Sequence, residues 1–156
     1  MTEITPFRPR AISATGALPD ETPGSDPLPH SIEAEQQVLG TLLTNNDVFD
    51  RIASVIGPTD FFDPVHARIF EVCAARIQKN ALASPVTLKA FLEGEEGLRA
   101  LGGPAYLVRL AGAAISGFAA RDYAQLIRDL AVRRELIRLG REVSEKAARV
   151  AVEMAN

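Results

Sequence analysis

The sequence predicts an all-α protein in which a small helical globule is followed by one long helix. Two observations support this fold class. Apolar residues recur at spacings of three and four along most of the chain after residue 30, as on one face of a helix. Alternation of apolar and polar residues, which would indicate strands, nowhere extends beyond about four positions. We expect the globule to span residues 30–118 and the long helix to span residues 119–156.

The segment 61–79, FFDPVHARIFEVCAARIQK, is predicted to form the central helix of the globule. Asp63 supplies an oxygen that can cap the helix, and Pro64 suits the first helical position because the amide there needs no partner. Phe61 and Phe62 precede the cap, where an apolar side chain can pack on the first turn. The apolar stripe consists of Val65, Ile69, Val72, Cys73 and Ile77.

Two helices are expected before this segment. Ser31 is a plausible N-cap for the first, and Glu33 and Glu35 lie in its first turn, where the helix dipole favours acidic residues. Asn45 and Asn46 are expected to end it. A second, shorter amphipathic helix should follow over 48–56, before a Gly-Pro pair stops it.

Shorter helices are expected after the central one. Ser84-Pro85 repeats the signal of a cap followed by proline, Pro104 starts another helix, and Gly117 allows a break before the long helix. The predicted core of the globule consists of Leu39, Leu42, Ile69, Phe70, Val72, Leu88, Phe91 and Leu107.

The long helix is predicted from Ala119 to about Val152, because this segment has no proline and a single glycine. Such a helix either lies across the small core or projects beyond it; a projecting helix would need a partner, as the first arm of a hairpin or dimer, or as a linker. The part from Ile137 onward is expected to meet another chain. The candidate interface residues are Tyr123, Ile127, Leu130, Arg133, Arg134, Ile137 and Val143.

Residues 1–29 differ in composition from the rest, with six of the ten prolines of the chain. Few of these residues are apolar, so the segment cannot offset the entropy cost of ordering. We predict a disordered tail. It serves either as a plain linker or, through Phe7, Arg8 and Arg10, as a docking peptide.

No arrangement of residues indicates catalysis, a cofactor or a metal. The two histidines, His30 and His66, are far apart in the sequence, and His66 is interpreted as a surface or capping residue. Neither a Cys-x-x-Cys pair nor a His-Glu-x-x-His motif is present, so no zinc site is predicted. The phosphate-binding loop Gly-x-x-x-x-Gly-Lys-Ser/Thr is also missing. We therefore expect a chain that is not an enzyme and binds no cofactor.

Composition narrows the possible locations and partners. Cys73 is the single cysteine and lies on the predicted core stripe, so it is expected to be a small buried hydrophobe. Neither a long apolar run nor a signal-peptide pattern is present, which predicts a cytoplasmic protein without a membrane anchor. A net charge of −3 gives no general indication of nucleic-acid binding.

Several short motifs, in order, resemble one family. The first is SIEAEQQVLG at residues 31–40, which is similar to the opening EAE…VLG signature of the N-terminal domain of the replicative hexameric DNA helicase of the DnaB type. The next is FF at 61–62 with HARIF at 66–70. Further similar segments are TLKAFL at 87–92, LGGPAYLVRL at 101–110, YAQLI at 123–127 and RRELI at 133–137. Each motif is weak alone, and their order and spacing make the set specific.

This resemblance implies a non-catalytic module for assembly and docking. In the family, copies of this domain pair through a helical hairpin and form a collar, a trimer of dimers, that binds primase and influences helicase loading. ATP hydrolysis and contact with DNA belong to a separate C-terminal domain. The hairpin needs a second long helix, so a chain that stops at Asn156 is expected to be an excised piece or to carry a shortened hairpin.

One alternative function remains open. The long helix carries six arginines within residues 121–141, and a helical module could use them to bind nucleic acid. Acidic residues on the same helix partly offset this charge, and aromatic residues for stacking on bases are few. The arginines are Arg121, Arg128, Arg133, Arg134, Arg138 and Arg141.

Overall fold

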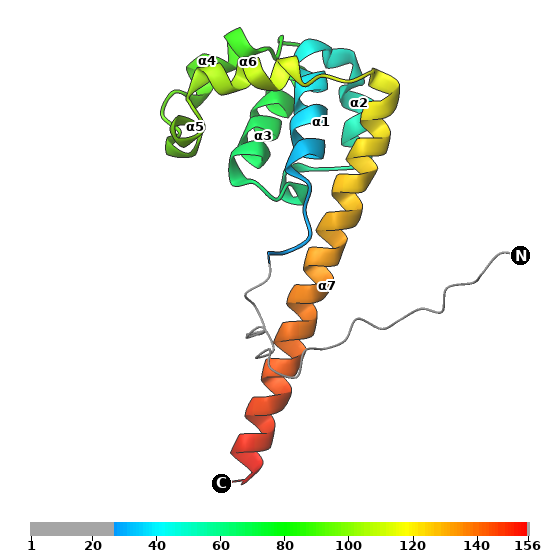
Figure 1. Cartoon of the computed structure of the whole chain (residues 1–156), viewed down its shortest axis with the longest axis vertical. Coiled ribbons are helices and arrows are strands. Elements are labelled where there is room, and N and C mark those ends of the chain that lie inside the picture. The colour runs from blue at the N-terminus through cyan, green and yellow to red at the C-terminus, as the bar shows by residue number, and fades with distance from the viewer. Residues whose placement is uncertain (1–26, 156) are drawn as a thin grey trace, which may run out of the picture.

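The computed structural model describes residues 27–155 and confirms the all-α class, since no strand occurs among these residues. Six helices form a globule, and the seventh leaves it as a long rod (Figure 1). The α-helices are α1 (Ile32–Thr44), α2 (Phe49–Ala53), α3 (Pro64–Gln78), α4 (Pro85–Leu92), α5 (Glu96–Ala100), α6 (Pro104–Gly112) and α7 (Gly117–Ala155). Two short 3₁₀ turns, Asn46–Val48 and Pro58–Asp60, flank α2.

The capping residues expected from the sequence occupy their places. Ser31 accepts a hydrogen bond from the Ala34 amide at 3.2 Å, and Asp63 accepts one from the Val65 amide at 2.8 Å. Ser84 begins α4 with a reciprocal pair of bonds to Thr87. The helix predicted over 48–56 is shorter than expected, because the chain closes a 3₁₀ turn first and α2 covers only Phe49–Ala53.

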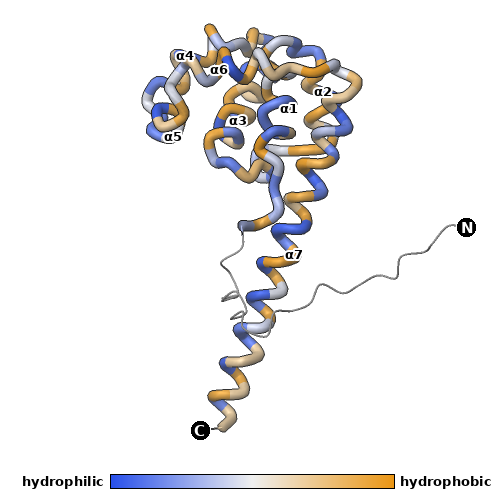
Figure 2. Tube along the Cα trace, viewed as in Figure 1, coloured by the Kyte–Doolittle hydropathy of each residue, from blue (hydrophilic) through white to orange (hydrophobic). Residues whose placement is uncertain are grey.

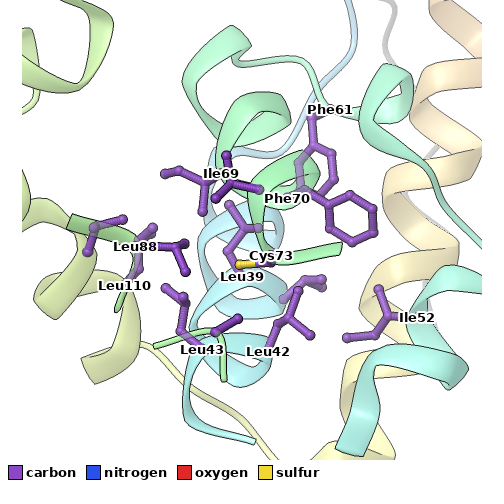
Figure 3. Packing of buried hydrophobic residues seen from close by; sticks show 14 of the residues in the cluster. Leu39, Leu42, Leu43, Ile52, Phe61, Ile69, Phe70, Cys73, Leu88 and Leu110 are labelled. Carbon is purple, nitrogen blue, oxygen red and sulfur yellow. The ribbon is translucent and has the colours of Figure 1, made fainter. Parts of the chain in front are cut away.

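The core of the globule lies where α1 and α3 meet the helices around them. Phe70 packs against Phe61, with ring centres 5.2 Å apart, and Figure 3 shows the Phe70 ring between Phe61 and Ile52. Cys73 is fully buried beside Leu39, which confirms the expectation for this cysteine. The other residues predicted for the core are buried as expected, with one exception. The confirmed residues are Leu39, Leu42, Ile69, Phe70, Val72, Leu88 and Leu107.

The exception is Phe91, for which the prediction is wrong because 53% of its surface is exposed. In α4 the buried positions are Leu88 and Leu92, a spacing of four that fixes the inner face of this short helix. Phe91 lies to the side of that face and packs under the guanidinium of Arg76 on α3 instead. Periodicity could not distinguish the edge of the apolar stripe from its centre.

The break expected at Gly117 lies directly before it, between the end of α6 and the start of α7. This glycine is the first residue of the helix, and a Cβ placed there would lie 2.9 Å from Cγ1 of Val48. The preceding Ser116 accepts a hydrogen bond from the Ala119 amide at 3.2 Å. Gly117 therefore allows α7 to begin in close contact with the globule, two residues earlier than predicted.

The predicted tail falls almost entirely outside the described residues, although Pro29 at its end is held by a hydrogen bond from Arg134 at 2.9 Å. Across residues 27–155, none of the helices combines the length and apolar character that a membrane span needs.

Candidate assembly surface

The first turns of α7 belong to the globule. Ala120, Ala124 and Ile127 are buried against α1 and α2, and Tyr123 packs at the edge of the same core. Their spacing of three and four is that of one helix face. The small alanines allow the long helix to approach closely, so these residues attach the rod to the globule.

An ion pair joins α7 to the loop before α3. The Arg128 guanidinium lies 2.7 Å from the Asp60 carboxylate, which is almost entirely buried while the arginine is half exposed. The other oxygen of Asp60 accepts a hydrogen bond from the Gly57 amide at 2.8 Å. One carboxylate thus closes the turn at Pro58–Asp60 and contacts the long helix.

Arg134 extends this attachment by about two turns. Its guanidinium donates to the carbonyl of Asp60 at 2.6 Å and to the carbonyl of Pro29 at 2.9 Å. It also lies over the ring of Phe62, 5.5 Å from the ring centre, and Phe62 stacks on His30 at 4.0 Å. Because two chain segments, residues 29–30 and residues 60–62, converge on this side chain, Arg134 fixes the direction in which α7 leaves the globule.

A buried polar network holds the same loop from the inside. The Glu35 carboxylate lies 2.9 Å from Nδ1 of His66, and the Tyr106 hydroxyl lies 2.5 Å from Nε2 of the same ring. Glu35 also accepts hydrogen bonds from the amides of Phe62, at 2.8 Å, and Asp63, at 3.3 Å. A neutral His66 with its proton on Nδ1 satisfies every one of these contacts: it donates to Glu35 and accepts from Tyr106.

The prediction that His66 is a surface or capping residue is therefore wrong. Its side chain is 0% exposed and links α1, α3 and α6. Burial is the main cause that raises the pKa of Tyr106 above its usual value. Glu35 gave a signal in the sequence, because a carboxylate in the apolar stripe of α1 needs a buried partner. Since His66 has no exposed surface, the network supports the fold and offers no access to a substrate.

Beyond the globule, α7 carries a second apolar face that points away from the first. This second face consists of exposed apolar side chains from Val132 to Met154. A helix turns by about 100° per residue, so these side chains lie roughly 120–180° round the helix axis from Ile127. Figure 2 shows apolar and polar segments following one another down this part of the helix. We call this set the outer face: Val132, Leu136, Leu139, Val143, Val150 and Met154, all exposed.

The side of α7 that continues the globule-facing surface is charged. Arg138 pairs with Glu135 at 2.6 Å and with Glu142 at 3.2 Å, and Glu142 also pairs with Lys146 at 3.0 Å. Such exposed pairs contribute little stability each, but they keep this side of the helix polar. The projecting part of α7 is therefore amphipathic, with its apolar side on the outer face.

The candidate interface residues divide between these surfaces. Ile127 is buried in the core of its own chain, while Tyr123, Leu130 and Ile137 are half-buried on the same side of the helix. Arg133 is exposed, and Arg134 forms the attachment described above. Only Val143, with 67% of its surface exposed, belongs to the outer face. Sequence reasoning missed Leu136 and Leu139, although their spacing of three with Val143 four residues later gave a detectable signal.

No group of three or more potential metal ligands occurs within the described part of the chain. The polar contacts of this region have a structural role. The Glu35–His66 network and the arginines Arg128 and Arg134 fix the direction of α7, whose outer face is apolar. Fold and surface together define a small all-helical module with a projecting amphipathic helix.

Comparison with known proteins identifies the family. Residues 27–129 match the family described as the DnaB-like helicase N terminal domain, and the chain belongs to this family. It is 32% identical over 135 residues to the replicative DNA helicase DnaB of Rickettsia conorii, and 33% identical over 120 residues to that of Rickettsia bellii. These matches cover 86% and 77% of this chain but only 27% and 24% of the relatives. The chain thus spans about a quarter of the length of the curated relatives that it matches.

Solved structures share the fold. The N-terminal domain of DnaB helicase from Mycobacterium tuberculosis superposes with a TM-score of 0.72 at 28% identity, covering 78% of this chain and 88% of that one. The N-terminal domain of DnaB helicase from Helicobacter pylori, described with its interactions with primase, gives a TM-score of 0.59 at 20% identity. That match covers 74% of this chain and 90% of the other.

Proposed function

We propose that this chain is the assembly and docking module of a replicative DNA helicase, and that it forms part of a collar through which copies associate. The observation that carries the proposal is the outer face of α7. A run of large apolar side chains along one side of a projecting helix is unusual on a protein surface without a partner. Family membership agrees with this proposal, since the matched relatives are replicative helicases.

The outer face suits a second helix. Its residues follow the spacing of three and four that lets helices pack side by side, and the part of α7 after Ile137 is about 27 Å long. Burial of apolar surface contributes roughly 25 cal/mol per Å². Association also costs translational and rotational freedom. The partner is the outer face of another copy, alone or with a second hairpin helix, and pairing through α7 alone is weak and concentration-dependent.

Docking of other replication proteins belongs to the same proposal. The Helicobacter pylori domain of the same fold is described with its interactions with primase, and we propose primase as a partner of this chain. A helicase loader is a further proposed partner. We propose no ATP-hydrolysing role for residues 1–156, because they contain no phosphate-binding loop. Purified alone, this chain should neither bind nor hydrolyse ATP.

Nucleic-acid binding through the arginines of α7 is less well supported. Arg128, Arg134 and Arg138 are already held by carboxylates or backbone carbonyls of their own chain. A helix that contacts phosphates would give binding that falls steeply with salt. Titration of single- and double-stranded DNA at two salt concentrations tests this alternative, and we expect no steep dependence.

Sedimentation equilibrium over a wide concentration range tests the assembly proposal. We expect a monomer–dimer equilibrium that Val143→Asp shifts towards monomer, because a carboxylate within an apolar contact is costly. Val86→Asp is the matched control: it makes the same change at an exposed valine on α4. A strict monomer at high concentration, or an equal effect of both variants, would contradict the role of the outer face.

A further inference from the structure

Two neighbouring hollows follow α3 on a flank of the globule that the assembly proposal leaves unexplained. This flank lies on the side of the globule away from α7 (Figure 1). The larger hollow, between the second half of α3 and α4, has a volume of about 270 Å³ and contains the Phe91 ring in its wall, so we call it the Phe91 pocket. The smaller hollow, between the first half of α3 and α5, has a volume of about 190 Å³.

The Phe91 pocket combines an exposed aromatic ring with an oriented cation. The Arg76 guanidinium lies 5.0 Å from the centre of the Phe91 ring, and its Nε donates to the carbonyl of Leu82 at 2.7 Å. These two contacts hold the cation beside the ring. A ligand that carries an apolar group next to an anion would therefore meet both partners already in position.

The charge that remains available in the pocket is positive. Arg68 is paired with Glu71, at 2.8 Å, and with Glu95, at 3.1 Å. In contrast, neither Arg76 nor Lys79 forms an ion pair with a carboxylate of residues 27–155. Two cations near the end of α3 can thus bind an anionic group beside an apolar ring.

The surroundings favour a peptide over a nucleic acid as the source of this anionic group. A phosphate backbone carries a charge on every nucleotide, and some of these would meet the carboxylates of Glu71 and Glu95. A peptide can place its carboxylates at the two cations alone. The smaller hollow shares Arg68 with the Phe91 pocket, and its other lining residues include Val65, Ile69, Leu92 and Leu98.

The length of the flank suits a short extended segment. The 15 residues of α3 extend over about 22 Å, and both hollows lie along this helix. An extended peptide of about seven residues has the same length. One aromatic and a few acidic side chains would use the Phe91 pocket, and apolar neighbours would use the smaller hollow.

We propose that this flank docks an acidic peptide segment of a partner protein, with an aromatic side chain on the Phe91 ring and carboxylates on Arg76 and Lys79. The rest of the segment follows α3 past Arg68 towards the smaller hollow. Exposed charges and a single ring give weak binding, with a dissociation constant on the order of 0.1–1 mM for a short peptide. This docking is independent of pairing through α7, since it uses a different surface.

A short acidic peptide with one tryptophan tests the proposal, because the chain itself contains no tryptophan. The peptide Asp-Asp-Trp-Glu-Glu, blocked at both ends, is titrated with the full chain at low salt. We expect its emission to move to shorter wavelength and to saturate, because the indole leaves water on binding. Asn-Asn-Trp-Gln-Gln is the matched control, and without carboxylates it should bind at least about fivefold more weakly.

Substitutions in the Phe91 pocket locate the binding. Phe91→Ala and the double variant Arg76→Glu with Lys79→Glu should each weaken binding of the acidic peptide by about fivefold or more. Arg99→Glu is the matched control for charge, because this exposed arginine on α5 does not line either hollow. The double variant should also bind Lys-Lys-Trp-Lys-Lys more tightly than the Arg99→Glu chain does, a gain that a folding defect cannot produce.

The possible outcomes are distinct. Equal binding of the acidic and the amide peptide overturns the proposal, as does unchanged binding after the pocket substitutions. Displacement of the peptide by single-stranded DNA or inorganic phosphate at equal ionic strength would show that the pocket binds phosphate, which also overturns it. An apparent affinity that falls as the protein concentration rises would show that a second copy fills the pocket, and this result would exclude a peptide of another protein.

Discussion

Arg128 on α7 and Asp60 in the loop before α3 lie 2.7 Å apart, although 68 positions separate them in the sequence. The contact connects the long helix to the segment that the Glu35–His66 network holds from the inside. The loop at residues 57–63 is therefore held by two groups of polar contacts: those from Arg128 and Arg134 on α7, and those from the buried Glu35 carboxylate. The direction of α7, and therefore of its outer face, depends on this loop.

The two partners of this ion pair should differ in their contribution to stability. Arg128→Ala should lower the free energy of unfolding by at most about 1 kcal/mol, because the arginine is half exposed. Asp60→Ala should cost about 1–3 kcal/mol, since it also leaves the Gly57 amide without its partner. Urea denaturation followed by circular dichroism measures both, with Arg133→Ala as a control at an exposed arginine. Equal losses at the two positions would contradict the double role of Asp60.

The buried network should behave as one unit. Glu35→Ala and His66→Ala should each cost on the order of 1–3 kcal/mol, because each leaves buried polar groups without partners. The double variant should cost less than the sum, since the contact between them is lost only once. Strictly additive losses in a double-mutant cycle would show that the two side chains stabilise the fold independently.

The two phenylalanines Phe70 and Phe91 provide a direct comparison of core and surface. Phe70→Ala should cost about 3–5 kcal/mol, because it removes a buried ring and leaves a cavity. Phe91→Ala should cost less than about 1 kcal/mol, as expected for a substitution outside the core. Thermal or urea unfolding of both variants measures these changes in the free energy of unfolding. A large loss at Phe91 would mean that its ring supports the globule and is not free to contact another segment.

The buried thiol makes stability depend on alkaline pH. Burial raises the pKa of Cys73 from 9.0 to about 12. Between these values the unfolded chain loses the thiol proton while the folded chain keeps it, so the free energy of unfolding should fall as the pH rises from about 9. Cys73→Ala should show a smaller slope. At pH 8 the native thiol should resist iodoacetamide and react only in urea, and rapid alkylation of the folded protein would contradict this burial.

Gly40 should tolerate no side chain. A Cβ at this position would lie 1.9 Å from the carbonyl oxygen of Leu110, where α1 crosses α6. Gly40→Ala should therefore cost at least about 1–3 kcal/mol through forced separation of the two helices. Gly140→Ala on α7 is the matched control: its Cβ meets no atom, and the change should stabilise by about 0.5–1 kcal/mol. Equal melting temperatures for the two variants would contradict the close crossing.

Local signals predicted the elements well because local interactions form them. Ser31, Asp63 and Ser84 cap helices as expected, and each acts within three residues of its own position. The order of apolar residues also predicted most of the core. Prediction failed for Phe91 and His66, whose burial depends on which neighbouring helix covers them. No spacing within a single helix contains that information.

The sequence by itself determined the helical class, the helix starts, the family and the existence of a long final helix, since caps, periodicity and motifs act over short distances. Only the tertiary structure decided which side of that helix is available to other chains. Ile127 turns inward because α1 and α2 cover it, and Val143, about 160° further round the axis, remains exposed beyond the end of the globule. The apolar residues of α7 are therefore buried near its start and exposed near its end, because burial depends on which other helices the fold places beside each turn.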